Sequence, residues 1–186
     1  MEKSETRFLI YRYFNLYVLI SFLGWIWETA YLLAGTGILY DRGFLTLPLC
    51  PIYATVLLGM YFIAGTLSDR RGLSSYIKND VSHVLIYLCL CFILPTIAEL
   101  LVGVFFLSIF NLRLWDYSYL NYNYGGHIAL EISTLWALGI FIFMNKIFPF
   151  LKKSVFKLNE KSAKTIACIL ASSILIDLII CVINNM

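Results

Sequence analysis

Residues Val81–Phe110 read VSHVLIYLCLCFILPTIAELLVGVFFLSIF and form a long apolar run. It contains one acidic residue, Glu99, and no lysine or arginine. A membrane-spanning helix needs about 20 mostly apolar residues, because the hydrocarbon core of a bilayer is about 30 Å thick. This stretch is long enough for a helix that tilts or extends beyond the bilayer. Pro95 lies midway along it and is expected to kink it.

The whole chain shares this apolar character. Its 186 residues are 61% hydrophobic and 13% charged, whereas a soluble domain carries about 25% charged residues. The composition excludes an ordinary soluble enzyme, a disordered chain and a nucleic-acid-binding protein. The five cysteines include no CxxC pair, so we expect neither a metal site nor a disulfide framework, and no cofactor.

Four further apolar runs reach the length of a membrane span. The sequence therefore predicts an all-α, polytopic bundle of five transmembrane helices that forms a single membrane domain over residues 1–186. The predicted spans are about 13–35, 48–67, 81–110, 128–147 and 163–183. Polar or proline-containing stretches break the chain between spans, at Asp69–Gly72 and at Pro149–Ser162.

The basic residues are distributed unevenly between the two sides of these spans. Only Arg42 and Arg113 fall on one side, and the other twelve of the 14 lysines and arginines fall on the opposite side. Positive charge accumulates in cytoplasmic loops, which predicts a cytoplasmic N-terminus and an outside C-terminus. The basic stretch 152–164 either lies on the anionic inner leaflet or is a solvated loop.

Acidic residues show the opposite bias. Six of the 11 lie in the predicted outer half: Glu28, Asp41, Glu99, Asp116, Glu131 and Asp177. An ionisable group within the bilayer costs several kcal/mol unless it faces a polar interior or a partner. We therefore expect a polar cavity between helices, open to the outside, in which carboxyls pair with Arg42, Arg113 or His127 or stay protonated. The alternative is a structural role, which is preferred for Asp177 because no motif surrounds it.

Two outer loops flank this predicted cavity. The first, residues 40–53, either dips into the membrane with Arg42 aimed at the acids or forms a tight surface turn. In the second, Arg113 and Asp116 can pair on one helical turn. His127 and Glu131 would share a helix face, as a metal or proton-relay pair or as a simple hydrogen-bonded pair, and two ligands are too few for a metal site. The tyrosines of this loop are typical of an interfacial aromatic belt.

Three sequence blocks carry a resemblance to a known family. The first is Gly24-Trp25-Ile26-Trp27-Glu28, and the second combines Asp41–Leu45 with Pro48–Tyr53. The third comprises Glu99, Gly103, Arg113, Trp115, Asp116, Tyr117, Ser118, Asn123, Gly126, Ile128, Ser133 and Trp136. Over about Tyr17 to Gly139 the chain resembles the bacterial family described as putative ABC-transporter type IV, a set of small multispan proteins. It departs from the family pattern at Asp41, Leu47, Ala54, Leu107 and Glu131.

The resemblance implies a permease role in the bacterial cytoplasmic (inner) membrane. The chain has no GxxxxGK[ST] loop, so any ATPase of such a system is a separate chain. We expect a transporter component whose outward-facing, acid-lined cavity binds a small polar or cationic solute. The alternatives are a membrane-embedded enzyme acting on a lipid or cell-envelope precursor, which is less favoured, and an accessory subunit of a larger complex.

The candidate residues for solute binding or proton relay follow from the charges and the matched blocks. They are Glu28, Arg42, Glu99, Arg113, Asp116, His127 and Glu131. No catalytic residue is assigned. The expected partners are the lipid bilayer, a separate ATPase, a small solute and a second copy of the chain, and no nucleic acid.

Overall fold

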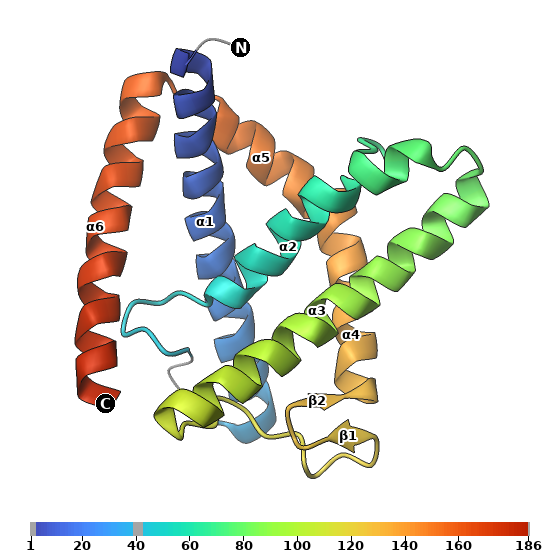
Figure 1. The fold of residues 1–186 in the computed structure, drawn as a ribbon, viewed down its shortest axis with the longest axis vertical. Helices are drawn as coiled ribbons and strands as arrows, with labels where there is room; N and C mark the ends of the chain where they lie inside the picture. The colour runs from blue at the N-terminus through green and yellow to red at the C-terminus, as the bar shows by residue number, and fades with distance from the viewer. Residues whose placement is uncertain (1–2, 39–42, 186) are drawn as a thin grey trace. The chain divides into compact units, whose positions relative to one another are not determined.

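The computed structural model describes residues 3–38 and 43–185, so Asp41 and Arg42 lie outside the described part. Most of the described chain is helical (Figure 1). The helices are α1 (Lys3–Thr36), α2 (Pro51–Ala64), α3 (Asp80–Phe110), α4 (Leu130–Ile142), α5 (Phe148–Phe156) and α6 (Glu160–Asn185). The smaller elements are a 3-10 helix (Gly72–Tyr76), a π-helical turn (Phe143–Ile147) and the strands β1 (Asn123–Tyr124) and β2 (Ile128–Ala129).

Four helical segments are long and apolar enough to cross a membrane. They are Glu5–Gly35, Asp80–Phe110, Leu130–Phe156 and Glu160–Asn185. The prediction of an all-α membrane bundle is confirmed. The fifth apolar helix, α2, is shorter than the predicted span 48–67. Its 14 residues extend about 21 Å, which is less than the thickness of the hydrocarbon core.

The chain forms two compact units, which are described separately. Unit 1 comprises Met1–Ala54 and Phe150–Met186, and unit 2 comprises Thr55–Pro149. In unit 1, α1 and α6 pack in parallel, because the start of each helix contacts the start of the other. Asn15 donates its Nδ2 to the Ala163 carbonyl (2.9 Å), and Arg12 donates to the Leu158 carbonyl (2.9 Å). Ala163 and Ala167 are buried, and such small residues let two membrane helices approach closely.

The segment 43–50 of unit 1 runs back along α1 and ends beside its middle. The Cys50 N–H donates to the carbonyl of Ser21 (3.0 Å), and Ser21 lies about 22 Å along α1 from its C-terminal end at Thr36. α2 therefore begins beside the middle of α1 (Figure 1). This course agrees with the predicted interpretation in which the loop dips inward, and its Arg42 lies outside the described residues. We call residues 43–50 the re-entrant segment.

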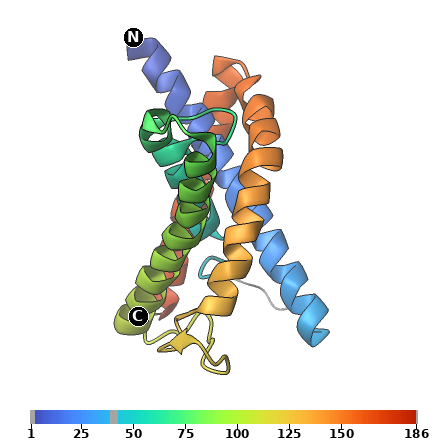
Figure 2. The same ribbon diagram turned by 90° about the vertical axis from the view of Figure 1, so that its right-hand side faces the viewer.

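Unit 2 is built on the antiparallel pair α3 and α4. α3 buries one residue in every four along a single face: His83, Tyr87, Cys91, Pro95, Glu99 and Gly103. Residues four apart lie on the same helix face, so this spacing places Glu99 and Gly103 side by side in the interface. The β1–β2 hairpin, in which Asn123 pairs with Ala129, lies at the end where α3 stops and α4 starts (Figures 1 and 2).

The fourth span is longer than predicted. The predicted break begins at Pro149, but the helix continues through Pro149 to Phe156, and α6 begins at Glu160. A π-helical turn precedes the proline, and in it the Phe148 N–H donates to the carbonyl of Phe143. Because proline lacks an N–H and normally disrupts a helix interior, we attribute the continuity to this change in hydrogen-bond register, which is typical of π-bulges.

Close packing of α1 on α6 predicts different responses to a larger side chain at two positions of α6. Ala163 is fully buried, whereas Ala171 is exposed. Overpacking a tight interface costs about 1–3 kcal/mol, so Ala163→Leu should lower the thermal unfolding midpoint in detergent by several degrees, and Ala171→Leu should leave it nearly unchanged. Equal midpoints for the two variants would contradict this packing.

Candidate functional site

Glu99 is the most deeply placed candidate acid of unit 2. Its residue is only 8% exposed, and it projects from the middle of α3. The Trp136 indole N–H donates to Glu99 Oε1 (2.9 Å), and the Tyr117 hydroxyl donates to the same oxygen (3.2 Å). Trp136 belongs to α4 and Tyr117 to the loop that follows α3. Three segments therefore meet at one carboxyl group, and two donors hold it in a fixed orientation.

His127 lies one helical turn from Glu99, against Gly103. A Cβ atom on Gly103 would lie 2.7 Å from His127 Nδ1, so only glycine allows the imidazole to approach the helix this closely. The Trp115 indole N–H donates to the His127 carbonyl (2.8 Å) and holds the backbone of this turn. The structure thus brings Glu99 and His127 to one end of the α3–α4 pair.

The expected pairing of His127 with Glu131 on one helix face is wrong. His127 belongs to the turn between β1 and β2, and α4 begins only at Leu130. The glycines at 125 and 126, both with positive φ, produce this tight turn, and the strand β2 separates the histidine from the helix. Glu131 is exposed in the first turn of α4, where the helix dipole favours an acidic side chain.

Arg113 and Asp116 form the predicted ion pair, although in an irregular loop and not on a helical turn. Arg113 Nη1 lies 2.8 Å from Asp116 Oδ1, and both side chains are about half exposed. The Ser118 N–H also donates to Asp116 (2.9 Å), and the Tyr117 N–H donates to the Gly126 carbonyl (2.9 Å). Hydrogen bonds from Ser118, followed by the charge and hydrogen bond of Arg113, lower the pKa of Asp116 below its ordinary value.

Glu28 is the candidate acid of unit 1. It contacts Tyr53, which follows the re-entrant segment in the first turn of α2. The Tyr53 hydroxyl donates to Glu28 Oε1 (2.9 Å). The Tyr53 ring lies on Gly24, one turn earlier in α1, where a Cβ atom would lie 2.5 Å from the ring. The Gly24–Glu28 block and the Pro51–Tyr53 block of the sequence are therefore in contact. The Tyr53 ring packs on Gly24, and its hydroxyl bonds to Glu28.

The candidate residues are thus divided between two places. Unit 2 holds Glu99, Arg113, Asp116 and His127 together at the loop end of the α3–α4 pair, and unit 1 holds Glu28. The sequence analysis did not assign Tyr53, Tyr117 or Trp136 as site residues, although each hydrogen-bonds a candidate acid. All three belong to the blocks that carry the family resemblance. Their place in these blocks is the feature of the sequence that could have identified them as site residues.

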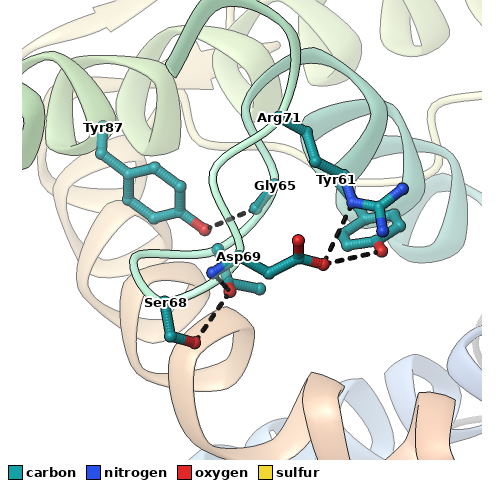
Figure 3. A network of polar contacts seen from close by, with 7 residues as sticks. Tyr61, Gly65, Ser68, Asp69, Arg71 and Tyr87 are labelled. Atoms are coloured by element: carbon teal, nitrogen blue, oxygen red, sulfur yellow. Dashed lines mark hydrogen bonds and ion pairs between the residues drawn. The ribbon is translucent and has the colours of Figure 1, made fainter. Parts of the chain in front are cut away.

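A second polar cluster of unit 2 lies at the opposite end of the α3–α4 pair (Figure 3). Asp69 accepts from the Tyr61 hydroxyl (3.1 Å) and from Arg71 Nε (3.0 Å), and the Tyr87 hydroxyl donates to the Gly65 carbonyl (3.1 Å). These contacts close the turn between α2 and α3. We interpret them as structural, because each links a side chain to the turn itself.

No metal site is apparent in the part of the chain that the structure describes. Over residues 3–38 and 43–185, no group of three or more His, Cys, Asp or Glu side chains could hold a metal ion. Hydroxyl donors contact both Glu99 and Glu28, and an indole donor also contacts Glu99.

Comparison with protein families gives a match over most of the chain. The family described as putative ABC-transporter type IV matches residues 15–182. The chain belongs to this family. No curated protein and no solved structure matches the chain. The match includes every described candidate residue, the re-entrant segment and Asp177.

Family membership and the apolar helices together define the broad role. The protein is a multi-pass membrane protein and a membrane transporter component. The match also extends beyond the region of the sequence resemblance, which ended near Gly139, and covers most of α6.

The pKa of Asp116 leads to a pH prediction for the loop 111–129. Because the pKa is lower in the folded protein, the contribution of the charged Asp116 to stability is complete well above the ordinary value of 3.8 and is lost progressively as the pH falls from that value to the lower, folded value. At about pH 5, hydrogen exchange of the loop, corrected for intrinsic rates, should therefore be as slow as at neutral pH, and it should become faster as the pH falls further.

Mass spectrometry of the loop peptide measures this exchange. Asp116→Asn should speed exchange at neutral pH, and the matched change Asp80→Asn, at the other end of unit 2, should not. Loop protection that is already lost at the ordinary aspartate pKa would contradict the assignment.

Proposed function

We propose that this transporter component binds a small cationic solute in its outer half, with Glu99 as the principal acid. The observation that carries the proposal is the buried carboxyl of Glu99, held at one oxygen by Trp136 and Tyr117. A carboxyl that two donors orient within an apolar helix pair marks a functional site more often than a chance placement. Its oxygens can contact a solute cation, and the neighbouring aromatic rings suit an ammonium group.

The charge distribution supports a cationic solute. The predicted outer half carries six acidic residues and only two arginines, of which Arg113 pairs with Asp116. An acidic entrance attracts cations and raises their local concentration. His127, one turn from Glu99, is a candidate for proton exchange with the site.

The re-entrant segment supports transport more specifically. Non-helical backbone at membrane depth is tolerated only against protein or a water-filled cavity, and discontinuous helices of this kind build the binding sites of many transporters. Glu28 lies where this segment enters α2, through its hydrogen bond with Tyr53. We propose that Glu28 is a second solute-binding acid.

The same proposal places the protein in the bacterial inner membrane with its N-terminus in the cytoplasm and a separate ATPase as partner. Within unit 2, Arg70, Arg71, Lys78 and Lys146 lie at the end opposite the Glu99 site. Within unit 1, the basic residues of α5 and α6 lie at the end where α1 and α6 begin. Both patterns agree with the positive-inside rule.

A binding screen tests the role of Glu99. Purified protein in nanodiscs is titrated with choline, ethanolamine, lysine, spermidine and K⁺, and tryptophan emission and the thermal midpoint are recorded. At least one cation should bind. Because loss of one partner of a buried charge pair costs about 2 kcal/mol or more, Glu99→Gln should weaken its binding at least about tenfold.

The matched control is Glu160→Gln, in the first turn of α6, which should bind as the wild type does. Failure of every cation to bind, or equal affinity of wild type and Glu99→Gln, would reject the proposed site.

A further inference from the structure

Asp177 is a buried acid that the candidate site does not include. It lies near the end of α6 and is 7% exposed. Its carboxylate accepts two hydrogen bonds from the re-entrant segment, 130 residues earlier in the chain. Thr46 Oγ1 donates to Oδ1, and the Leu47 N–H donates to Oδ2 (3.0 Å). One side chain thus supplies both acceptors for adjacent residues of a non-helical segment.

The re-entrant segment also contacts α1 and bonds within itself. The Cys50 N–H donates to Ser21, and the Leu49 N–H donates within the segment to Leu47 (2.7 Å). Leu45 and Leu49 add an apolar contact by packing with Val18 of α1. The contacts that hold the segment therefore include the Ser21 carbonyl of α1, a small apolar cluster and the carboxylate of Asp177.

This position is transmitted to the Glu28 site. Cys50 ends the segment, and its carbonyl accepts the Tyr53 N–H in the first turn of α2 (3.2 Å). The same Tyr53 donates its hydroxyl to Glu28. A displacement of the segment would move the start of α2, and the Tyr53 hydroxyl would leave Glu28. Asp177 does not need to touch Glu28 to control it.

We propose that Asp177 is a positioning residue of the transporter, which fixes the re-entrant segment at membrane depth and thereby sets the Tyr53–Glu28 hydrogen bond. Both donors need an acceptor, which a carboxylate offers at each oxygen, whereas an asparagine presents an N–H₂ group to one of them. This inference concerns the position of Glu28 and stands whether or not Glu28 contacts a solute, so it is tested independently of the cation screen.

The thiol of Cys50 reports the position of the segment, because Cys50 is 6% exposed in the folded protein. The full-length protein in nanodiscs is labelled with N-ethylmaleimide, and mass spectrometry gives the rate at each cysteine. Asp177→Asn should raise the rate at Cys50 about tenfold, the effect of losing a hydrogen bond to a charged group from a locally opening segment. Cys91, which is fully buried in unit 2, should not change.

Two further variants complete this measurement. Ser173→Ala, one turn before Asp177, is the matched control, because the Ser173 hydroxyl bonds to its own helix at Ile169 (3.0 Å) and its loss should not change the rate at Cys50. Thr46→Val removes one donor to Asp177 and keeps the side-chain shape. It should raise the rate about threefold and serves as the main variant if Asp177→Asn does not accumulate.

A double variant distinguishes two roles of Asp177: positioning of the Tyr53–Glu28 hydrogen bond and general stabilisation of the fold. Tyr53→Phe removes the hydroxyl that bonds to Glu28 and should raise the rate at Cys50 on its own. If release of the segment already breaks the Tyr53–Glu28 hydrogen bond, adding Tyr53→Phe to Asp177→Asn, or to Thr46→Val, should leave the rate close to that of the first variant alone.

Three results would overturn the proposal. They are an unchanged rate at Cys50 in both Asp177→Asn and Thr46→Val, a parallel rise at Cys91, and effects of the two changes in the double variant that simply multiply.

Discussion

Backbone N–H and C=O groups at membrane depth have no water to bind, so each must find its partner within the protein. Helices satisfy this constraint by themselves, but the re-entrant segment cannot. Its Leu47 and Cys50 N–H groups donate to the Asp177 carboxylate and to the Ser21 carbonyl. These two acceptors lie on α6 and on α1. The packing of the two helices thus brings together the two acceptors that this non-helical segment uses.

The long apolar runs made four of the helices predictable, because their length and hydropathy leave no alternative to a membrane span. The extent of α2 was not predictable in the same way. The run 48–67 is apolar throughout, and hydropathy does not distinguish helical from non-helical backbone when both are buried. The partner that stabilises the non-helical part, Asp177, is distant in sequence, so no local pattern around Pro48 or Pro51 reveals it. The same separation explains why Asp177 looked isolated.

The parts of the candidate site that depend on charge alone were predictable from the sequence. Glu99 stands out as the single acid of an apolar run, and the pairing of Arg113 with Asp116 follows from opposite charges three residues apart. The partners of Glu99 were not predictable from composition, because an interfacial tyrosine or tryptophan looks the same in sequence whether it anchors the chain in headgroups or donates to a buried acid. His127 was misplaced because helical spacing to Glu131 was assumed across a stretch that forms a glycine turn and the strand β2.

The candidate acids of the two units have similar surroundings: each lies one helical turn from a glycine on which a polar ring packs. In α1, Gly24 precedes Glu28 by one turn, and Tyr53 lies on the glycine and donates to the acid. In α3, Gly103 follows Glu99 by one turn, and the His127 ring lies on that glycine. A side chain larger than glycine would exclude either ring. A glycine four residues from a membrane acid therefore makes room for a polar ring beside it, which gives these family motifs a physical reason and makes glycine–acid spacing a more informative signal than the acid alone.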